Sequence, residues 1–281
     1  MLRSVSPFVI RHSSFLRFPM TTLSATKHRI FSPARVNAIA GNTLLELVRL
    51  KVFYFLLLFA LLIIGSSGSG KTTLLKCIVG LHEPTSGDVL YDDVNFTTMH
   101  FEGRVPIRKQ IGMLFQNSAL FDSMTVEQNI IFPLNLFTDM AKSEKHDRAD
   151  FCLKRVNLEG KNKLFPSELS GGMKKRVGIA RAISMQPKYL FVDEPNSGLD
   201  PLTAILIDEL ISELTEEYQT TTVVVTHDMN SVMGIGDHII FLHDGKKWWE
   251  GSNHEIAHTN NKELNSFVFA SKFMKAAREK L

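Results

Sequence analysis

The sequence is poor in cysteine and lacks an apolar run long enough to cross a membrane by itself. Its 281 residues include two cysteines, Cys77 and Cys152, which are too few and too far apart for a disulfide framework and favour a reducing compartment. The longest uninterrupted apolar run, residues 52–64, has 13 residues, whereas a spanning helix needs about 20. The sequence has no internal repeat, and its length allows one large domain or one domain with an appendage.

Acidic residues are absent from residues 1–43, which are rich in serine and arginine. This composition is typical of a targeting presequence, or of a translated leader that is not part of the working protein, and it carries no fold signal. Residues 1–64 together hold eight basic residues and one acid, which leaves 24 basic and 28 acidic residues for the rest of the chain. The first quarter is therefore a different kind of sequence from the remainder.

Residues 44–64 form a hydrophobic segment whose structure the sequence leaves open. Arg49 and Lys51 precede the apolar run, and such a basic flank fits the cytoplasmic side of a membrane. One interpretation is a buried strand or helix, or a signal-like apolar core. The other is the start of a membrane helix whose end is missing.

From about Gly65 onward the pattern becomes an alternation of short apolar runs and helical stretches. Runs of buried-strand type occupy residues 61–65, 110–115, 188–193 and 221–226. Strands of this kind separated by helices indicate an α/β fold with a parallel sheet.

Three further segments complete the domain that we assign to residues 65–281. Residues 117–168 have helical spacing and are interpreted as an inserted helical subdomain. Residues 238–251 read as a hairpin with Asp244 and Gly245 at its turn. Residues 262–281 read as a charged C-terminal helix suited to docking.

The loop from Gly65 to Thr72 fits the phosphate-binding pattern G-x-x-x-x-G-K-[ST] at every position. Its glycines let backbone N–H groups curl around phosphate oxygens, and the helix after it adds its positive N-terminal end. Lys71 is expected to reach the β- and γ-phosphates, and the Thr72 hydroxyl to coordinate Mg²⁺. A flexible Gly/Ser linker would need neither Lys-Thr after the last glycine nor a strand before it.

Two other motifs are weaker when taken alone. An apolar strand ends in Asp193 and Glu194, of which one carboxylate can hold Mg²⁺ and the next can polarise an attacking water. A Gly-rich turn at Ser170, Gly171 and Gly172 opens a helix, which binds anions, although a simple helix cap would also explain it.

Together these motifs resemble the ABC ATPase family over Gly65 to about Gly251, in the family's order. The resemblance implies a P-loop NTPase fold with a RecA-like core and the inserted helical subdomain, and it implies ATP and Mg²⁺ as cofactors. Lys71, Glu194 and His227, the switch histidine, would be catalytic. Thr72, the Q-loop residue Gln116 and Asp193 would hold the metal. The nucleotide would be bound by the Walker A loop, the Q-loop, the signature motif and the D-loop, at Gly65, Ser66, Ser67, Gly68, Ser69, Gly70, Lys71, Thr72, Thr73, Gln116, Ser170, Gly171, Gly172 and Asp200.

The family's mechanism implies partners for this chain. Two ATPase domains would sandwich two ATP molecules, with the signature motif of each copy facing the γ-phosphate bound by the other. A membrane permease dimer would dock near Gln116, and no nucleic acid is expected.

A narrower resemblance concerns the segments LFQNSALFDSMTVEQNIIFPL and ELSGGMKKRVGIARAI. They are similar to ATPases of the maintenance-of-lipid-asymmetry and Mce-associated transporters, which move phospholipids or related hydrophobic lipids. This resemblance implies a peripheral protein on the cytoplasmic face of a bacterial inner membrane, with a lipid-binding Mce-type subunit as a further partner.

The sequence departs from the family before the phosphate loop. ABC ATPases carry a β-subdomain there with an aromatic residue that stacks on adenine, and it is apparently missing from residues 1–64, where Tyr54 and Phe55 are poor candidates. Residues 35–67 instead resemble the beginning of an ABC permease. We expect either a joined sequence that switches near Gly65, giving an unstable or weakly active chain, or a divergent N-terminus that supplies the missing strands.

Other functions compete with a lipid-transport ATPase. The chain could serve another class of ABC transporter, or be a membrane-anchored fusion held by residues 44–64. ABC ATPases that act on DNA or ribosomes usually carry two cassettes or long coiled-coil insertions, and neither is present. A catalytically dead regulatory subunit is disfavoured by the intact Lys71, Asp193, Glu194 and His227.

Overall fold

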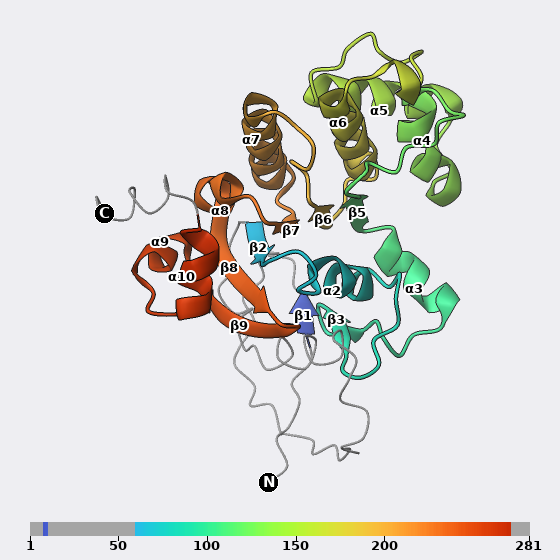
Figure 1. The fold of residues 1–281 in the computed structure, drawn as a ribbon. Helices are drawn as coiled ribbons and strands as arrows, with labels where there is room; N and C mark the ends of the chain where they lie inside the picture. The colour runs from blue at the N-terminus through green and yellow to red at the C-terminus, as the bar shows by residue number, and fades with distance from the viewer. Residues whose placement is uncertain (1–7, 11–59, 271–281) are drawn as a thin grey trace.

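The centre of the molecule is a mostly parallel six-stranded sheet (Figure 1). The computed structural model describes residues 8–10 and 60–270. In the sheet order, the strands are β5 (Ile111–Leu114), β6 (Tyr189–Asp193), β7 (Thr221–Thr226), β2 (Ala60–Ile64), β8 (Gly236–His243) and β9 (Lys246–Gly251). The first five are parallel and β9 is antiparallel to β8. The predicted parallel α/β sheet and the predicted hairpin around Asp244 are therefore confirmed.

The central strands are buried on both faces, as their continuous apolar runs predict. All five residues of β2 are buried. Leu61 and Ile63 belong to one apolar core, whereas Leu62 and Ile64 belong to the other, because successive side chains of a strand point to opposite faces. The C-terminal part of the hydrophobic segment, residues 60–64, is thus a strand of the central sheet.

Helices cover the two faces of the sheet. One face packs on α2 (Lys71–Ile78) and on Ile107 of α3 (Phe101–Arg108). The other face packs on α7 (Pro201–Tyr218), α8 (Met229–Ile235), α9 (Asn253–His258) and α10 (Lys262–Val268). Residues 271–281, the rest of the expected C-terminal helix, lie outside the described residues.

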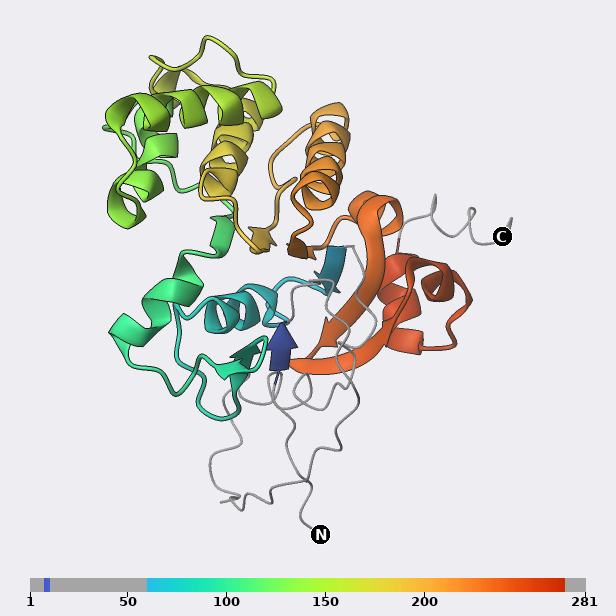
Figure 2. The same cartoon turned by 180° about the vertical axis from the view of Figure 1, so that it is seen from behind.

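A group of helices projects from the sheet on the side of β5 (Figures 1 and 2). It comprises α4 (Val126–Phe137), α5 (Lys142–Arg155), a 3₁₀ turn (Pro166–Glu168) and α6 (Gly171–Ile183). Helix α4 begins at a capping box, in which the Thr125 side chain accepts from the Gln128 backbone and the Gln128 side chain accepts from the Thr125 backbone. Because α6 packs on both α4 and β5, it joins this group to the sheet.

A second, three-stranded sheet has the order β1 (Phe8–Ile10), β3 (Val89–Tyr91) and β4 (Val94–Asn95). Strand β1 lies within residues 1–43, where the sequence gives no fold signal, because a three-residue strand is too short to leave a periodic pattern in the sequence. Tyr91 anchors this sheet, with its hydroxyl donating to the Ile78 carbonyl and its ring against Tyr189. Tyr54, Phe55 and residues 52–59 of the apolar run lie outside the described residues.

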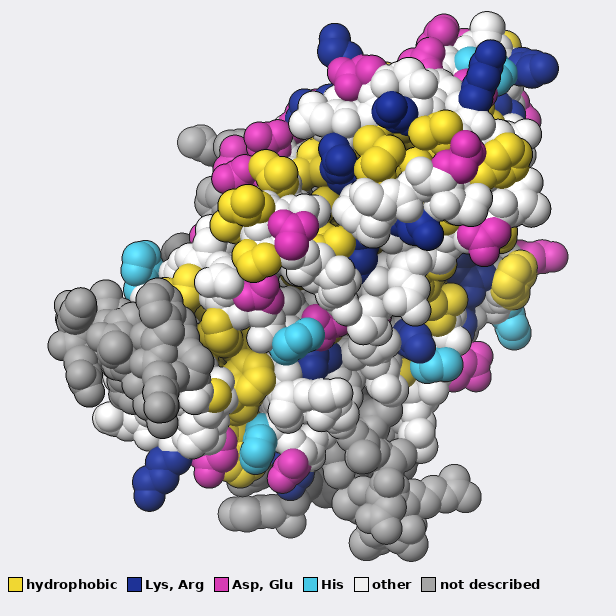
Figure 3. Space-filling model, turned by 45° about the horizontal axis from the view of Figure 1, so that its top comes forward, with side chains coloured by type: hydrophobic (Ala, Val, Ile, Leu, Met, Phe, Trp, Pro, Cys, Tyr) yellow, Lys and Arg dark blue, Asp and Glu magenta, His cyan; other side chains and the backbone are white. Residues whose placement is uncertain are grey.

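The surface mixes charges of both signs with separate apolar patches (Figure 3). Cys77 and Cys152 are free and buried. Over residues 60–270 and the short strand β1, no helix is both long and apolar enough for a membrane crossing.

Candidate active site

The polar residues of the sequence motifs meet where the parallel strands end. Strand β2 runs into the loop at Gly65, β5 leads to Gln116, β6 ends in Asp193 before Glu194, and β7 precedes His227. Carboxyl ends of parallel strands share one edge of a sheet, where such folds bind their ligands. Residues more than a hundred positions apart in the sequence, such as Thr72 and Asp193, are thereby brought together.

The phosphate loop needs glycine at its two ends. Gly65 has a φ of 154°, and a Cβ there would stand 2.3 Å from the Leu242 carbonyl oxygen, so a side chain cannot be accommodated. Gly70 has a φ of 97° and precedes α2 without a side-chain cap. The first N–H groups of α2 therefore stay free of side-chain capping and point along the positive end of the helix dipole.

Lys71 is folded back over the loop. Its Nζ donates to the Gly65 carbonyl at 2.8 Å and to the Ser66 carbonyl at 2.9 Å, and the residue is 6% exposed. Burial lowers the pKa of Lys71, while the nearby Glu194 and Asp193 carboxylates act in the opposite direction. The ammonium is thus held at the centre of the loop, where a bound phosphate would need it.

One buried polar atom of the loop fits an anion. The Ser69 hydroxyl oxygen is buried and has no hydrogen-bond partner among the described residues, although buried hydroxyls are normally paired. A phosphate oxygen would supply the missing acceptor. The loop, the uncapped start of α2 and Lys71 together fit a polyphosphate group.

Thr72 and Asp193 form an oxygen pair suited to Mg²⁺. The Thr72 hydroxyl donates to Asp193 Oδ1 at 3.0 Å. Burial raises the pKa of Asp193, and the hydrogen bond from Thr72 opposes that rise. Magnesium sites commonly use one or two protein oxygens together with substrate phosphates, which agrees with the absence of a larger His, Cys, Asp and Glu cluster within the described parts of the chain. The Gln116 side chain is exposed.

Glu194 and His227 form a contact across two strands. His227 Nδ1 lies 2.7 Å from Glu194 Oε2. Glu194 has a left-handed backbone with a φ of 47°, and its N–H donates to the Val225 carbonyl at 2.8 Å. The histidine side chain is 62% exposed and that of the glutamate 10%. A buried carboxylate with an accessible imidazole beside it can accept and pass on a proton from water.

The signature and D-loop residues lie at other helix starts. Ser170 caps α6 by accepting from the Met173 N–H at 3.3 Å, and Asp200 caps α7 by accepting from the Thr203 N–H at 3.0 Å. The two starts are close, because a Cβ on Gly172 would stand 2.7 Å from Thr203 Cγ2. Within the described residues, no hydrogen bond joins these caps to the phosphate loop of the same chain.

Sequence reasoning missed Lys175 and a buried polar network beside the site. Lys175 Nζ donates to the carbonyls of Gln116 and Glu194. Lys175 lies on the apolar stripe of α6, four residues before buried Ile179 and seven before Ala182. Helical periodicity could therefore have predicted that this lysine is buried.

The missed network joins three elements. Asn196 Nδ2 donates to Asp208 Oδ1 and to Ser231 Oγ, both at 2.9 Å, and the Ser231 hydroxyl donates to Asp208 Oδ2 at 2.7 Å. The network connects the loop after β6 to α7 and α8. No local pattern predicts it, since its members are separated by 12 to 35 residues.

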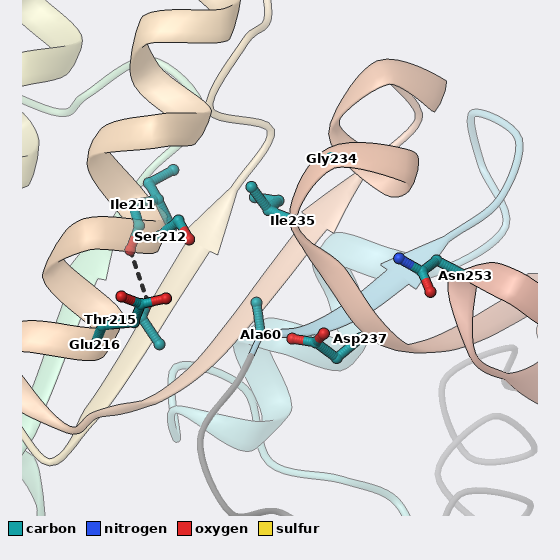
Figure 4. A pocket seen from close by; sticks show the side chains of 9 residues that line it. All are labelled: Ala60, Ile211, Ser212, Thr215, Glu216, Gly234, Ile235, Asp237 and Asn253. Carbon is teal, nitrogen blue, oxygen red and sulfur yellow. Dashed lines mark hydrogen bonds between the residues drawn. The ribbon is translucent and has the colours of Figure 1, made fainter.

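A pocket of about 220 Å³ lies at the opposite, amino end of β2 (Figure 4). Ala60, Glu216 and Asp237 are among its lining residues. None of the motif residues lines it, so it is separate from the phosphate loop.

The fold and this site define a P-loop nucleoside triphosphatase. A family model described as ABC transporter matches residues 59–197. The chain is 40% identical over 206 residues to the intermembrane phospholipid transport system ATP-binding protein MlaF of Escherichia coli K12, which spans 73% of this chain and 77% of that protein. It is also 42% identical over 189 residues to the methionine import ATP-binding protein MetN of Bacillus subtilis, covering 67% of this chain and 55% of that protein. The chain belongs to the ABC transporter family of ATPases.

Solved structures agree with this assignment. The dimeric bacterial ABC transporter cassette MJ0796 superposes with a TM-score of 0.65 at 36% identity, over 70% of this chain and 85% of that chain. The structure of cbiO1 from Clostridium perfringens gives 0.66 at 30% identity, over 79% and 88%. The predicted ABC ATPase fold is thereby confirmed, and the chain is an ATP-hydrolysing enzyme of that fold.

Proposed function

We propose that this ATPase powers the movement of a phospholipid or a related hydrophobic lipid through a partner permease. The observation that carries the proposal is the 40% identity to MlaF over 77% of its length, joined to a phosphate site whose lysine, threonine and acidic residues are all in place. A second candidate is import of a small metabolite, favoured by the 42% identity to MetN.

Each site residue has a role in the proposed hydrolysis. Lys71, Ser69 and the backbone of residues 65–73 bind the phosphates, and Thr72, Asp193 and Gln116 would hold Mg²⁺. The metal would neutralise charge on the phosphates. Glu194 accepts a proton from the attacking water, and His227, 2.7 Å from it, orients that carboxylate and contacts the γ-phosphate. Because the transition state is nearly all charge rearrangement, fixing these groups beforehand supplies most of the acceleration.

The site is completed by a second copy of the chain. Ser170 caps α6, which begins with Gly171 and Gly172, and Asp200 caps α7. Among the described residues, neither cap has a hydrogen bond to the phosphate loop of its own copy. In a head-to-tail pair, their N–H groups and hydroxyl face the γ-phosphate bound by the partner. The dimeric cassette among the similar structures supports this arrangement.

The permease docks beside the Gln116 loop. Phe121, Leu136 and Phe165 of the helical group are 41%, 60% and 41% exposed, and exposed apolar side chains of this size favour a protein contact. The ATPase then sits peripherally on the cytoplasmic face of a bacterial inner membrane, with an Mce-type lipid-binding subunit as a further component. Extraction with carbonate tests this placement, since a peripheral ATPase is released whereas a chain anchored through residues 44–59 stays with the membrane.

Turnover of ATP by the purified full-length chain tests the catalytic part. Mg²⁺-dependent turnover that Glu194→Gln lowers at least about 100-fold is expected. Soluble full-length protein without turnover would instead favour a joined sequence whose ATPase is impaired. A chain that begins at Leu50 would then also lack turnover.

The transported compound is tested with the Glu194→Gln complex isolated from native membranes. Slow hydrolysis should hold the complex closed, so its bound small molecules can be identified by mass spectrometry. Enriched phospholipid supports the proposal. Enrichment of methionine or another metabolite in place of lipid supports the second candidate.

A further inference from the structure

Lys175 is the buried cation at the junction of three motif segments. It is 4% exposed and lies on α6, the helix that starts at Ser170. Burial lowers its pKa, while the carboxylates of Asp193 and Glu194 act against that shift. A buried ammonium is costly unless its donors are satisfied, so its two acceptors define what the side chain does.

Both acceptors are main-chain carbonyls at the active site. The ammonium donates to the Gln116 carbonyl and, at 3.0 Å, to the Glu194 carbonyl. These two carbonyls belong to segments that follow neighbouring parallel strands, β5 and β6. One ammonium thus ties the Gln116 loop and the proposed catalytic glutamate to the helix that begins at the signature motif.

The bond to Glu194 bears on its unusual backbone. A φ of 47° is a left-handed backbone conformation that residues other than glycine rarely adopt. On one side the Glu194 N–H donates to the Val225 carbonyl, and on the other the carbonyl accepts from Lys175. With both backbone groups held, the carboxylate is directed to the position where it meets His227.

We propose that Lys175 is a positioning residue, which fixes Glu194 in its strained backbone conformation and couples it to the Gln116 loop and α6. It does not touch the nucleotide. Any shift of α6 or of the Gln116 loop is transmitted through the ammonium to the Glu194 backbone, so the helical group and hydrolysis are mechanically linked. This inference rests on the proposed role of Glu194 in activating water.

Two substitutions separate the donors from the charge. Lys175→Met keeps an unbranched side chain but removes every donor. Lys175→Gln removes the charge and retains two N–H donors on a side chain that is one bond shorter. Lys174→Met is the matched control, because Lys174 lies next to Lys175 on α6 and its side chain is only partly buried.

The kcat and KM for ATP are measured on the purified full-length chain, together with melting temperature. Lys175→Met is expected to lower kcat at least about tenfold and to change KM less than about threefold, since the loss falls on an oriented carboxylate rather than on binding. Lys175→Gln should restore kcat to within about threefold of the parent, and Lys174→Met should match the parent. In a Glu194→Gln background, Lys175→Met should cause no further loss, because the two residues act through one group.

Several results would overturn the proposal. A parent-like kcat in Lys175→Met would do so, as would an equal loss in Lys175→Gln, or a further tenfold loss in the Glu194→Gln background. If Lys175→Met does not fold, Lys175→Gln decides: parent-like kcat supports the proposal, and a tenfold loss at unchanged melting temperature refutes it. Failure of the proposed function is recognised separately, because Glu194→Gln would then turn over like the parent.

Discussion

Acidic residues of other elements lie in different settings near the two ends of strand β2. At the carboxyl end, Asp193 and Glu194 have hydroxyl and imidazole partners, and two buried ammonium groups lie nearby. At the amino end, Glu216 and Asp237 line the pocket of Figure 4, where no lysine or arginine is among the lining residues that the structure describes. Burial, followed by the charge of Glu216, raises the pKa of Asp237.

This difference shows that acidic residues lining a cavity do not by themselves make a phosphate-binding site. In a parallel sheet, helix N-termini with their free N–H groups follow the carboxyl ends of strands. A buried cation can be balanced there by acids, as the Glu194 and Asp193 carboxylates balance Lys71. Among the described residues, no lysine or arginine lines the pocket at the amino end, and the charge of Glu216 adds to the burial that raises the pKa of Asp237.

The largest expected difference between the two ends comes from removing the loop ammonium. Lys71→Met should lower ATP turnover by roughly 1,000-fold, because a preorganised cation at the transferring phosphoryl group is lost. Glu216→Gln, at the amino end, should leave turnover unchanged. Steady-state hydrolysis at saturating Mg²⁺-ATP measures both, and equal losses would remove the distinction between the two ends.

Metal chemistry should also be confined to the carboxyl end. Asp193→Asn should reduce turnover by about 100-fold, since it weakens the oxygen pair with Thr72 and the metal's share of charge neutralisation. Chelation of Mg²⁺ with EDTA should abolish turnover in the parent. The same titration applied to Asp237→Asn should reproduce the parent curve, and a shifted metal requirement there would contradict the comparison.

Stability should depend more on the polar network behind the carboxyl end than on exposed acids of the same helix. Asp208→Ala removes the acceptor for Asn196 and Ser231, so it should lower the free energy of unfolding by about 1–3 kcal/mol. Glu209→Ala, one residue further along α7 and exposed, is the control. Urea unfolding followed by circular dichroism compares them, and equal values would mean that the network is not stabilising.

The smallest expected effect is a pH-dependent change in stability that comes from Asp237 at the amino end of β2. Because the pKa of Asp237 is raised, the folded state holds a proton more tightly than the unfolded state does. Its contribution to stability is present below the ordinary aspartate pKa of about 3.9 and is lost as pH rises through the higher folded value.

Asp237→Asn removes this loss. The melting temperature of the variant minus that of the parent should therefore rise with pH across that window and then stay constant. A difference that does not change between pH 4 and pH 7 would show that the pKa of Asp237 is not raised in the folded state.

Much of the fold was predictable because the signals are local. The buried strands, the phosphate loop and the turn at Asp244 each depend on a few neighbouring residues whose spacing fixes their backbone. Strand β1 was not predictable in this way, because its three residues are ordered by pairing with Val89–Tyr91, far along the chain.

By itself the sequence determined the motif residues, their order and the parallel α/β class, since glycine spacing and apolar periodicity are properties of the chain. The tertiary structure alone decided which of these residues meet. The contact of His227 with Glu194 requires β6 and β7 to be neighbours, and the two acceptors of Lys175 require α6 to lie against β5. Such contacts depend on strand order and helix packing, which bring together side chains that no local pattern relates.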